Sequence, residues 1–384
     1  MLRWCAIASL AAAAAGVSAQ AVQGVTDAEI VIGSITDLSG PVASVGAPHR
    51  DGMLLAAEEI NAAGGIHGRK LRIVVEDSSY DPKKAVLAAQ KLLTQDKVFA
   101  LIGTLGSAAV QSTQNLALDR NVPNLFPMAS SEISYLPYHP LKFGIFPPSS
   151  EHMRVVVKYA HDRLNKRRFA IIYQDDETGQ AAMRAAEAQL KVHGLTPVEK
   201  TSHKRGDTSF SSQVSRMKAA NPDIVLLGVN PREAAAIAAE TRTQGWPVDI
   251  ILYTGATAAV TALGGKAAEG MYGANGFVGM AQQASPAYQA ISERFKARFG
   301  RDMADGVNFG YATVMLFAEG AKNAGRDLTP LSFSQGLEKV KDFRTVFEAA
   351  PVSYAPNDHA PPKDAYIFQV KSGKWTMIDG PMSY

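Results

Sequence analysis

Two serine hydroxyls lie where the sequence predicts the ends of neighbouring strands. Ser107 follows the apolar run 99–102 and a glycine-rich turn and begins a helix-like segment, and Ser130 comes shortly after the next apolar run, 122–126. Parallel strands bring their carboxyl ends to one edge of a sheet, so both hydroxyls are expected in one crevice. The unpaired N–H groups and positive dipole end of a helix at Ser107 suit an anionic group such as a carboxylate. The alternative is that Ser107 only caps its helix and that Ser130 is an ordinary loop residue.

Sequence patterns for reactive chemistry are absent. There is no dinucleotide fingerprint, no Walker A motif and no nucleophile elbow. No histidines pair at metal-ligand spacing, and His152 and His161 are expected on a helix surface. The acidic run 175–177 either forms a general acid/base pair or is a solvated strand-to-helix loop. We therefore predict a binding protein rather than an enzyme, with no metal and no cofactor.

The first 19 residues differ from the rest of the chain. Met1-Leu-Arg3 is a short basic start, an alanine-rich apolar stretch follows, and Val17-Ser18-Ala19 fits a cleavage site. This pattern predicts a secretory signal peptide, residues 1–19. The only cysteine, Cys5, lies inside it, too early to be lipidated, so the mature chain would have no disulfide and no thiol.

The remaining chain has the composition of a soluble protein. Of its 384 residues, 46% are hydrophobic and 20% charged, and the formal net charge is +3. No apolar run approaches the ~18 residues of a membrane span. The basic clusters at 166–168 and 203–205 carry no interleaved aromatics, so we expect no nucleic-acid partner. We expect a soluble, periplasmic monomer.

Strand-like and helix-like segments alternate, which is typical of parallel sheets covered on both faces. In the first half, strands are expected at 29–35, 71–76, 99–102 and 122–126, and helices at 49–62, 82–95 and 107–120. A loop at 131–150, rich in proline and aromatics, is expected to cross to a second lobe. There, strands are expected at 169–173, 195–200, 224–227 and 249–253, and helices at 151–164, 178–192, 210–219 and 231–244. A strand at 270–278, helices at 286–299, 308–324 and 332–341, and extended segments at 352–354 and 365–370 complete the series.

Several motifs in order resemble one family. They are Ile30-Val-Ile-Gly33 with Leu38-Ser-Gly-Pro41, Asn61-Ala-Ala-Gly-Gly-Ile66, Glu76-Asp77 with Tyr80-Asp-Pro82, Ile102-Gly103 with Ser107, and Tyr173-Gln-Asp-Asp176 with Gly179. Together they resemble the branched-chain amino-acid type of periplasmic solute-binding protein that serves ABC importers. The resemblance implies two Rossmann-like α/β lobes of the type I periplasmic binding fold, joined by three crossings, with the ligand in the cleft. It places lobe 1 at 26–147 plus 277–350 and lobe 2 at 148–276 plus 351–384.

The resemblance also implies a ligand site. In the amino-acid binders, the ligand carboxylate is held at the positions matching Ser107, Ala129 and Ser130, with Met128 beside them. The loop expected to supply an acid for the ammonium contains Thr254 and no acid, so Asp176 or Asp37 would have to substitute. Val45 stands where the family has an aromatic residue, and another aromatic near Thr178 is missing. Ser39 and Asn230 complete the candidate set.

The expected function is that of an extracytoplasmic receptor. It would bind a small carboxylate-bearing solute, a branched-chain amino acid or analogue, by hinge closure and deliver it to ABC permease subunits in the inner membrane. One alternative is a receptor of the same fold for an aromatic or organic acid or an amide. Others are a ligand sensor for a membrane kinase and an exported hydrolase.

Overall fold

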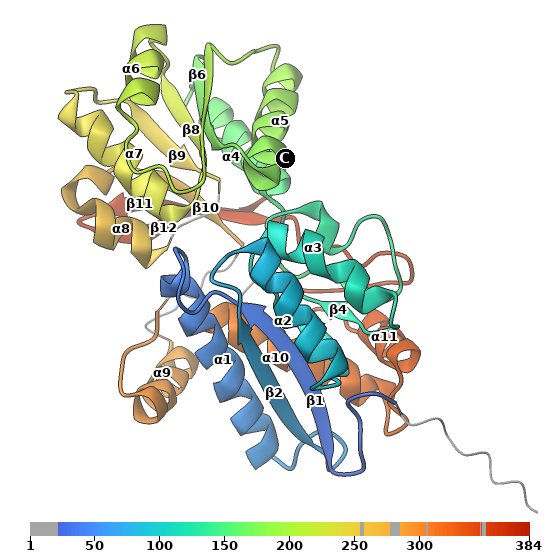
Figure 1. Cartoon of the computed structure of the whole chain (residues 1–384). Helices are drawn as coiled ribbons and strands as arrows, with labels where there is room; N and C mark the ends of the chain where they lie inside the picture. The colour runs from blue at the N-terminus through green and yellow to red at the C-terminus, as the bar shows by residue number, and fades with distance from the viewer. Residues whose placement is uncertain (1–21, 254–256, 277–284, 305, 346, 348–350) are drawn as a thin grey trace, which may run out of the picture.

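The chain forms two α/β lobes, each built on one sheet (Figure 1). The computed structural model describes residues 22–384 except 254–256, 277–284, 305, 346 and 348–350. The predicted signal peptide and Thr254 lie outside the described residues. Within the described residues, no helix combines the length and hydrophobicity that a membrane crossing requires.

Lobe 1 has a five-stranded parallel sheet in the order β2-β1-β3-β4-β5. Its strands are β1 (Glu29–Thr36), β2 (Lys70–Asp77), β3 (Ala100–Ile102), β4 (Asn124–Leu125) and β5 (Lys142–Phe143). Three helices connect them, namely α1 (Ala43–Ala62), α2 (Pro82–Thr94) and α3 (Ser107–Leu118). The core of this lobe also includes residues of α9 (Pro286–Phe299), α10 (Val307–Ala324) and α11 (Pro330–Glu338).

Lobe 2 has a seven-stranded sheet in the order β12-β11-β10-β9-β8-β6-β7. Its parallel strands are β6 (Phe169–Gln174), β7 (Glu199–His203), β8 (Ile224–Gly228), β9 (Asp249–Leu252) and β10 (Tyr272–Asn275). The antiparallel strands β11 (Ala365–Lys371) and β12 (Lys374–Met382) extend one edge. The helices are α4 (Ser149–Asp162), α5 (Glu177–Val192), α6 (Ser211–Ala220), α7 (Pro231–Thr243) and α8 (Ala258–Gly264), and short 3₁₀ helices lie at Glu132–Ser134 and Gly265–Ala268.

Both lobes therefore share one strand order, and this order locates the site. In each lobe the second strand lies outside the first, and the third, fourth and fifth strands follow on the other side of the first. The order reverses between β1 and β3 and between β6 and β8, and open α/β sheets bind ligands at the carboxyl ends of the strands beside such a reversal. The chain passes between lobes after β5, after β10 and before β11, which gives the three crossings that were expected. The residue boundaries proposed for the lobes stay a prediction.

Several expected elements differ from the observed ones. Helix α1 begins at Ala43 rather than near residue 49, although it contains Pro48, because Asp37 accepts hydrogen bonds from the backbone amides of Ser39, Gly40 and Val42 just before it. Strand β7 covers 199–203 rather than 195–200. The segment 352–354, expected to be extended, joins neither sheet, and Val352 makes an isolated antiparallel bridge to Phe343. Strands β5 and β12 were not expected. The two residues of β5 are too short a signal to show in a sequence.

Candidate functional site

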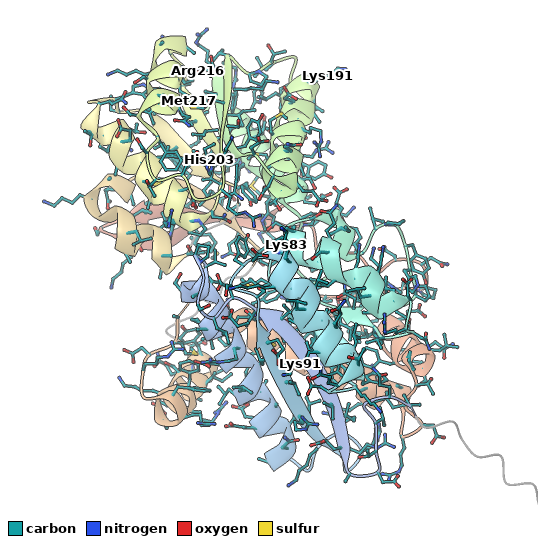
Figure 2. All side chains as sticks on the ribbon, viewed as in Figure 1. Lys83, Lys91, Lys191, His203, Arg216 and Met217 are labelled. Carbon is teal, nitrogen blue, oxygen red and sulfur yellow. The ribbon has the colours of Figure 1, made fainter. Side chains whose placement is uncertain are left out.

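A cavity of about 170 Å³ lies between the two lobes at the carboxyl ends of these strands. The segments that line it follow β1, β3 and β4 in lobe 1 and β6, β8 and β9 in lobe 2, and α10 contributes residues at its start. In lobe 1, α2 runs from Lys83, near the facing lobe, to Lys91, away from it (Figure 2). The helix N-termini of this lobe therefore face the cleft.

Helix α3 presents an uncapped N-terminus to the cavity. Gly106 is its N-cap residue, and no side chain caps its first amides. Gly106 has a φ of 97°, and a Cβ there would lie 2.7 Å from a ring carbon of Tyr80, so both the turn and the close packing require glycine. Ser107 is therefore the first helical residue and not the N-cap. This position contradicts the alternative that Ser107 only caps its helix. The free amides and the helix dipole at this point favour an anion.

Ser107 is buried and faces lobe 2. Its side chain is only 6% exposed, and Thr178 Oγ1 donates a hydrogen bond to Ser107 Oγ across the cleft at 2.8 Å. Ser130 shares a hydrogen bond with the hydroxyl of Tyr253, whose pKa is raised by burial. Both hydroxyls predicted to share a crevice thus line the same cavity.

Most of the other predicted residues also line this cavity. They are Val45, Met128, Ala129, Thr178 and Asn230. Ser39 does not line it, because its exposed hydroxyl donates to Asp77 Oδ2 at 2.6 Å. Asp37, one of the two acids considered for an ammonium, is fully buried and bonds backbone amides at the start of α1.

Among the described residues that line the cavity, Asp176 is the only one with a charged side chain. It is the N-cap of α5, where its Oδ1 accepts from the amide of Gly179 at 3.0 Å. Its Oδ2 accepts from the side-chain amide of Gln174 and from Arg205 Nη2 at 3.1 Å. Arg205 also lies over the ring of Tyr80 in lobe 1, 4.6 Å from its centroid. The charge of Asp176 is thus already matched by an arginine that contacts both lobes.

Sequence reasoning missed much of the lining. The lining residues that were left out of the candidate set include Val42, Tyr80, Leu105, Phe146, Gln174, Tyr253, Asn275, Asn308 and Phe309. Tyr80 and Gln174 each belong to a motif that carried the resemblance, so both had a usable signal. Phe146, Asn308 and Phe309 come from segments distant in sequence, and only the packing of α10 and of the first crossing against lobe 1 brings them to the cavity.

Comparisons with known proteins identify the class. The family model for periplasmic binding proteins matches residues 29–374, and the chain belongs to this family. An amino acid binding protein of Pseudomonas aeruginosa is 27% identical over 304 residues, 78% of this chain and 79% of that protein. A leucine-specific-binding protein of Salmonella typhimurium is 30% identical over 288 residues, 74% of this chain and 76% of that protein.

Solved structures show the same fold. A branched-chain amino acid binding protein, LivJ of Streptococcus pneumoniae in complex with isoleucine, superposes with a TM-score of 0.79 at 24% identity and covers 91% of this chain and 99% of its own. A fatty acid ABC transporter substrate-binding protein of Thermomonospora curvata gives a TM-score of 0.83 at 22% identity, covering 95% of each chain. The fold is therefore the type I periplasmic binding fold expected from the sequence. The family and these relatives are named for binding and not for catalysis, in agreement with the prediction that the chain is not an enzyme.

Proposed function

We propose that the chain is the extracytoplasmic solute-binding receptor of an ABC importer and binds a small carboxylate with an apolar body. The observation that carries this proposal is the uncapped N-terminus of α3, with the buried hydroxyl of Ser107, at an otherwise largely apolar cavity between the lobes. The described lining contains no lysine, arginine or histidine. A carboxylate there would be stabilised by amides, hydroxyls and the helix dipole.

The apolar part of the cavity limits the size and nature of the ligand body. Val42, Val45, Leu105, Phe146 and Phe309 contribute apolar side chains. An apolar cavity of about 150 Å³ takes up benzene, so a cavity of about 170 Å³ suits a branched aliphatic or a single aromatic body. This size range covers branched-chain amino acids and their analogues.

The arrangement around Asp176 favours a ligand that does not require an α-amino group. A buried ammonium needs a carboxylate partner, and Asp176 is already paired with Arg205. The second candidate, a receptor for an aromatic or organic acid or an amide, is supported by this pairing. It is also supported by the side-chain amides of Gln174, Asn230, Asn275 and Asn308 in the lining.

Delivery to a permease requires two arrangements of the lobes. Direct contacts across the cleft, from Thr178 to Ser107 and from Ser131 to Glu177, support the proposal that the structure represents a closed arrangement. We infer that residues 1–19 direct export to the periplasm, where the closed receptor would reach ABC permease subunits in the inner membrane. The family and the resemblance support this role.

The test is a thermal-shift screen of the mature chain, unfolded and refolded beforehand to remove any co-purified solute. The panel contains branched-chain amino acids, their desamino acids, phenylacetate, dicarboxylates and the corresponding amides. A raised melting temperature with apolar monocarboxylates, confirmed by calorimetry at one ligand per chain, supports the proposal. Stabilisation by amides or dicarboxylates alone would contradict it.

A further inference from the structure

The second feature with recognisable chemistry lies in lobe 2, away from the cleft. His161, Asp162 and His193 each offer one ligand atom, and these atoms all lie within 4.8 Å of one another. His161 Nδ1 is 2.6 Å from Asp162 Oδ1, and the two imidazole rings are stacked with centroids 3.9 Å apart. Among the described residues, these three are the only histidine and acidic side chains that form a group of three close enough to share one ion.

The ends of two packed helices hold these side chains. His161 and Asp162 end α4, and His193 is the C-cap residue of α5, which lies beside α4 in the same lobe. The negative end of a helix dipole favours a cation, and here two such ends point to one place. Lys191, two residues before His193, lies at the end of α5 that is remote from lobe 1 (Figure 2).

The site is open to solvent, and its imidazoles are suited to bind metal. His161 and His193 are half-buried and Asp162 is exposed. An imidazole binds a metal ion through a ring nitrogen that carries no proton, and each of these two rings offers one nitrogen within 4.8 Å of the other ligand atoms. The side-chain nitrogen of Gln189 donates towards His193 Nε2 at 3.4 Å, so a metal ion bound at that ring nitrogen would replace this hydrogen bond.

Neighbouring cations have other partners. Arg167 donates to the backbone carbonyls of His161 and Lys166, and Lys158 Nζ donates to the carbonyl of Ser383. Lys166 forms an ion pair with Asp249. These contacts direct the positive charges to other acceptors. The nearby cations still make the local electrostatic potential less negative than the carboxylate of Asp162 alone would make it.

We propose that His161, Asp162 and His193 form a site for a divalent transition metal of the zinc, copper or nickel class. Two imidazoles and one carboxylate are a ligand set that suits these ions, whereas calcium and magnesium prefer oxygen ligands alone. Ligands sit about 2.0–2.2 Å from zinc, so side-chain rotation at the helix ends is enough to bring the three atoms onto one ion. A bound ion would tie the end of α4 to the end of α5. It would stabilise lobe 2 without contacting the solute cavity.

The test is calorimetry and thermal shift of the untagged mature chain with zinc chloride and nickel chloride. We expect one ion per chain and a raised melting temperature. In His193→Ala and in His161→Ala, affinity should fall by more than the roughly 10- to 100-fold that loss of an outer-shell partner costs, and the thermal shift should disappear. The matched control is His67→Asn in lobe 1, an exposed histidine whose left-handed backbone asparagine tolerates, and it should leave zinc binding unchanged.

Three outcomes would overturn the proposal. They are no saturable binding, equal zinc affinity in the His193→Ala chain, and equal stabilisation by calcium chloride. Both variants change partly exposed side chains, and their melting temperatures without metal show whether they fold. Solute binding measured with and without zinc separates this site from the cleft, because the proposal expects the solute affinity to stay the same.

Discussion

Thr178 in lobe 2 donates a hydrogen bond to Ser107 in lobe 1, with 2.8 Å between the two hydroxyl oxygens. This contact joins the first turn of α5 to the first turn of α3. Both residues line the cavity, so a ligand that bonds to both hydroxyls would contact both lobes. The predictions below begin from this pair.

Replacing Ser107 by alanine should weaken ligand binding without destabilising the fold. A hydrogen bond to a charged group contributes about 1.5–3 kcal/mol, which corresponds to roughly a 10- to 150-fold loss of affinity. Gly106 and not Ser107 is the N-cap, so no cap is lost and the melting temperature should stay near that of the wild type. Calorimetry and thermal denaturation measure the two effects separately.

The control for this variant is Ser112→Ala in the same helix. Ser112 donates to the carbonyl of Ala109 and is not part of the cavity lining. It should bind ligand as the wild type does. If Ser107→Ala and Ser112→Ala bind equally well, the hydroxyl of Ser107 has no role in binding.

Replacing Arg205 by alanine should favour the open arrangement. The guanidinium contacts Tyr80 of lobe 1 and Asp176 of lobe 2, and a cation–π contact at a partly exposed site contributes about 0.5–1 kcal/mol. We expect a loss of affinity of roughly two- to fivefold, with the rate of ligand dissociation increased. Arg216→Ala is the control, because Arg216 pairs with Glu199 within lobe 2 (Figure 2). An unchanged dissociation rate in Arg205→Ala would show that this contact does not hold the lobes together.

The α-amino group of an amino-acid ligand should contribute little to affinity. We expect 4-methylpentanoate to bind within about tenfold of leucine, a difference of about 1.4 kcal/mol. The Asp176→Asn chain keeps a good N-cap for α5 and removes the charge, and it should change the ratio of the two affinities only slightly. Tight binding of leucine alone, lost in Asp176→Asn, would instead identify Asp176 as the ammonium partner.

Stability should fall in moderately acidic solution because two buried histidines are neutral in the folded state. Burial lowers the pKa of His49 from 6.5 to about 3 and that of His152 to about 4, and neither ring has a hydrogen-bond partner for its nitrogens. The unfolded chain takes up these protons near pH 6.5. The stabilisation is therefore complete above that pH and is lost as the pH falls towards the folded-state values. From about pH 6.5 to 4.5 each histidine should cost roughly 2 kcal/mol of unfolding free energy.

Denaturant titrations across this pH range check the prediction. His49→Leu and His152→Leu should each flatten the dependence of unfolding free energy on pH, whatever their effect at neutral pH. His67→Asn, an exposed site, should leave the slope unchanged. An unaltered slope in both leucine variants would mean that other groups cause the acid sensitivity.

Ligand binding should reduce the radius of gyration. A solute that contacts both lobes binds the closed arrangement selectively and shifts the equilibrium towards it. Small-angle scattering of the refolded chain with and without a ligand confirmed by calorimetry measures the change. An identical radius in both conditions would contradict hinge closure.

The sequence by itself determined the fold class and two of the hydroxyl groups that line the cavity, those of Ser107 and Ser130. Alternating strand and helix signals predict parallel sheets, and motifs such as Asn61-Ala-Ala-Gly-Gly-Ile66 predict the family, because these signals are local in the chain. Ser107 and Ser130 were found because each lies in the short segment that follows a predicted strand. They line one cavity because the two strands are adjacent and parallel, so that their carboxyl ends lie at the same edge of the sheet.

The tertiary structure decided what depends on distant segments. His152 was expected on a surface and is instead fully buried, since one helix face cannot be assigned until its neighbours are known. His161 and His193 are far apart in sequence and meet only because α4 packs against α5. Asp176 and Arg205 pair because the segments that follow the adjacent strands β6 and β7 lie side by side in lobe 2. The contact of Arg205 with Tyr80 depends in addition on how closely the lobes approach. Local sequence patterns indicate which side chains can bind a ligand. The distances between those side chains depend on how helices and strands pack within each lobe and between the lobes, and this packing involves residues far apart in the sequence.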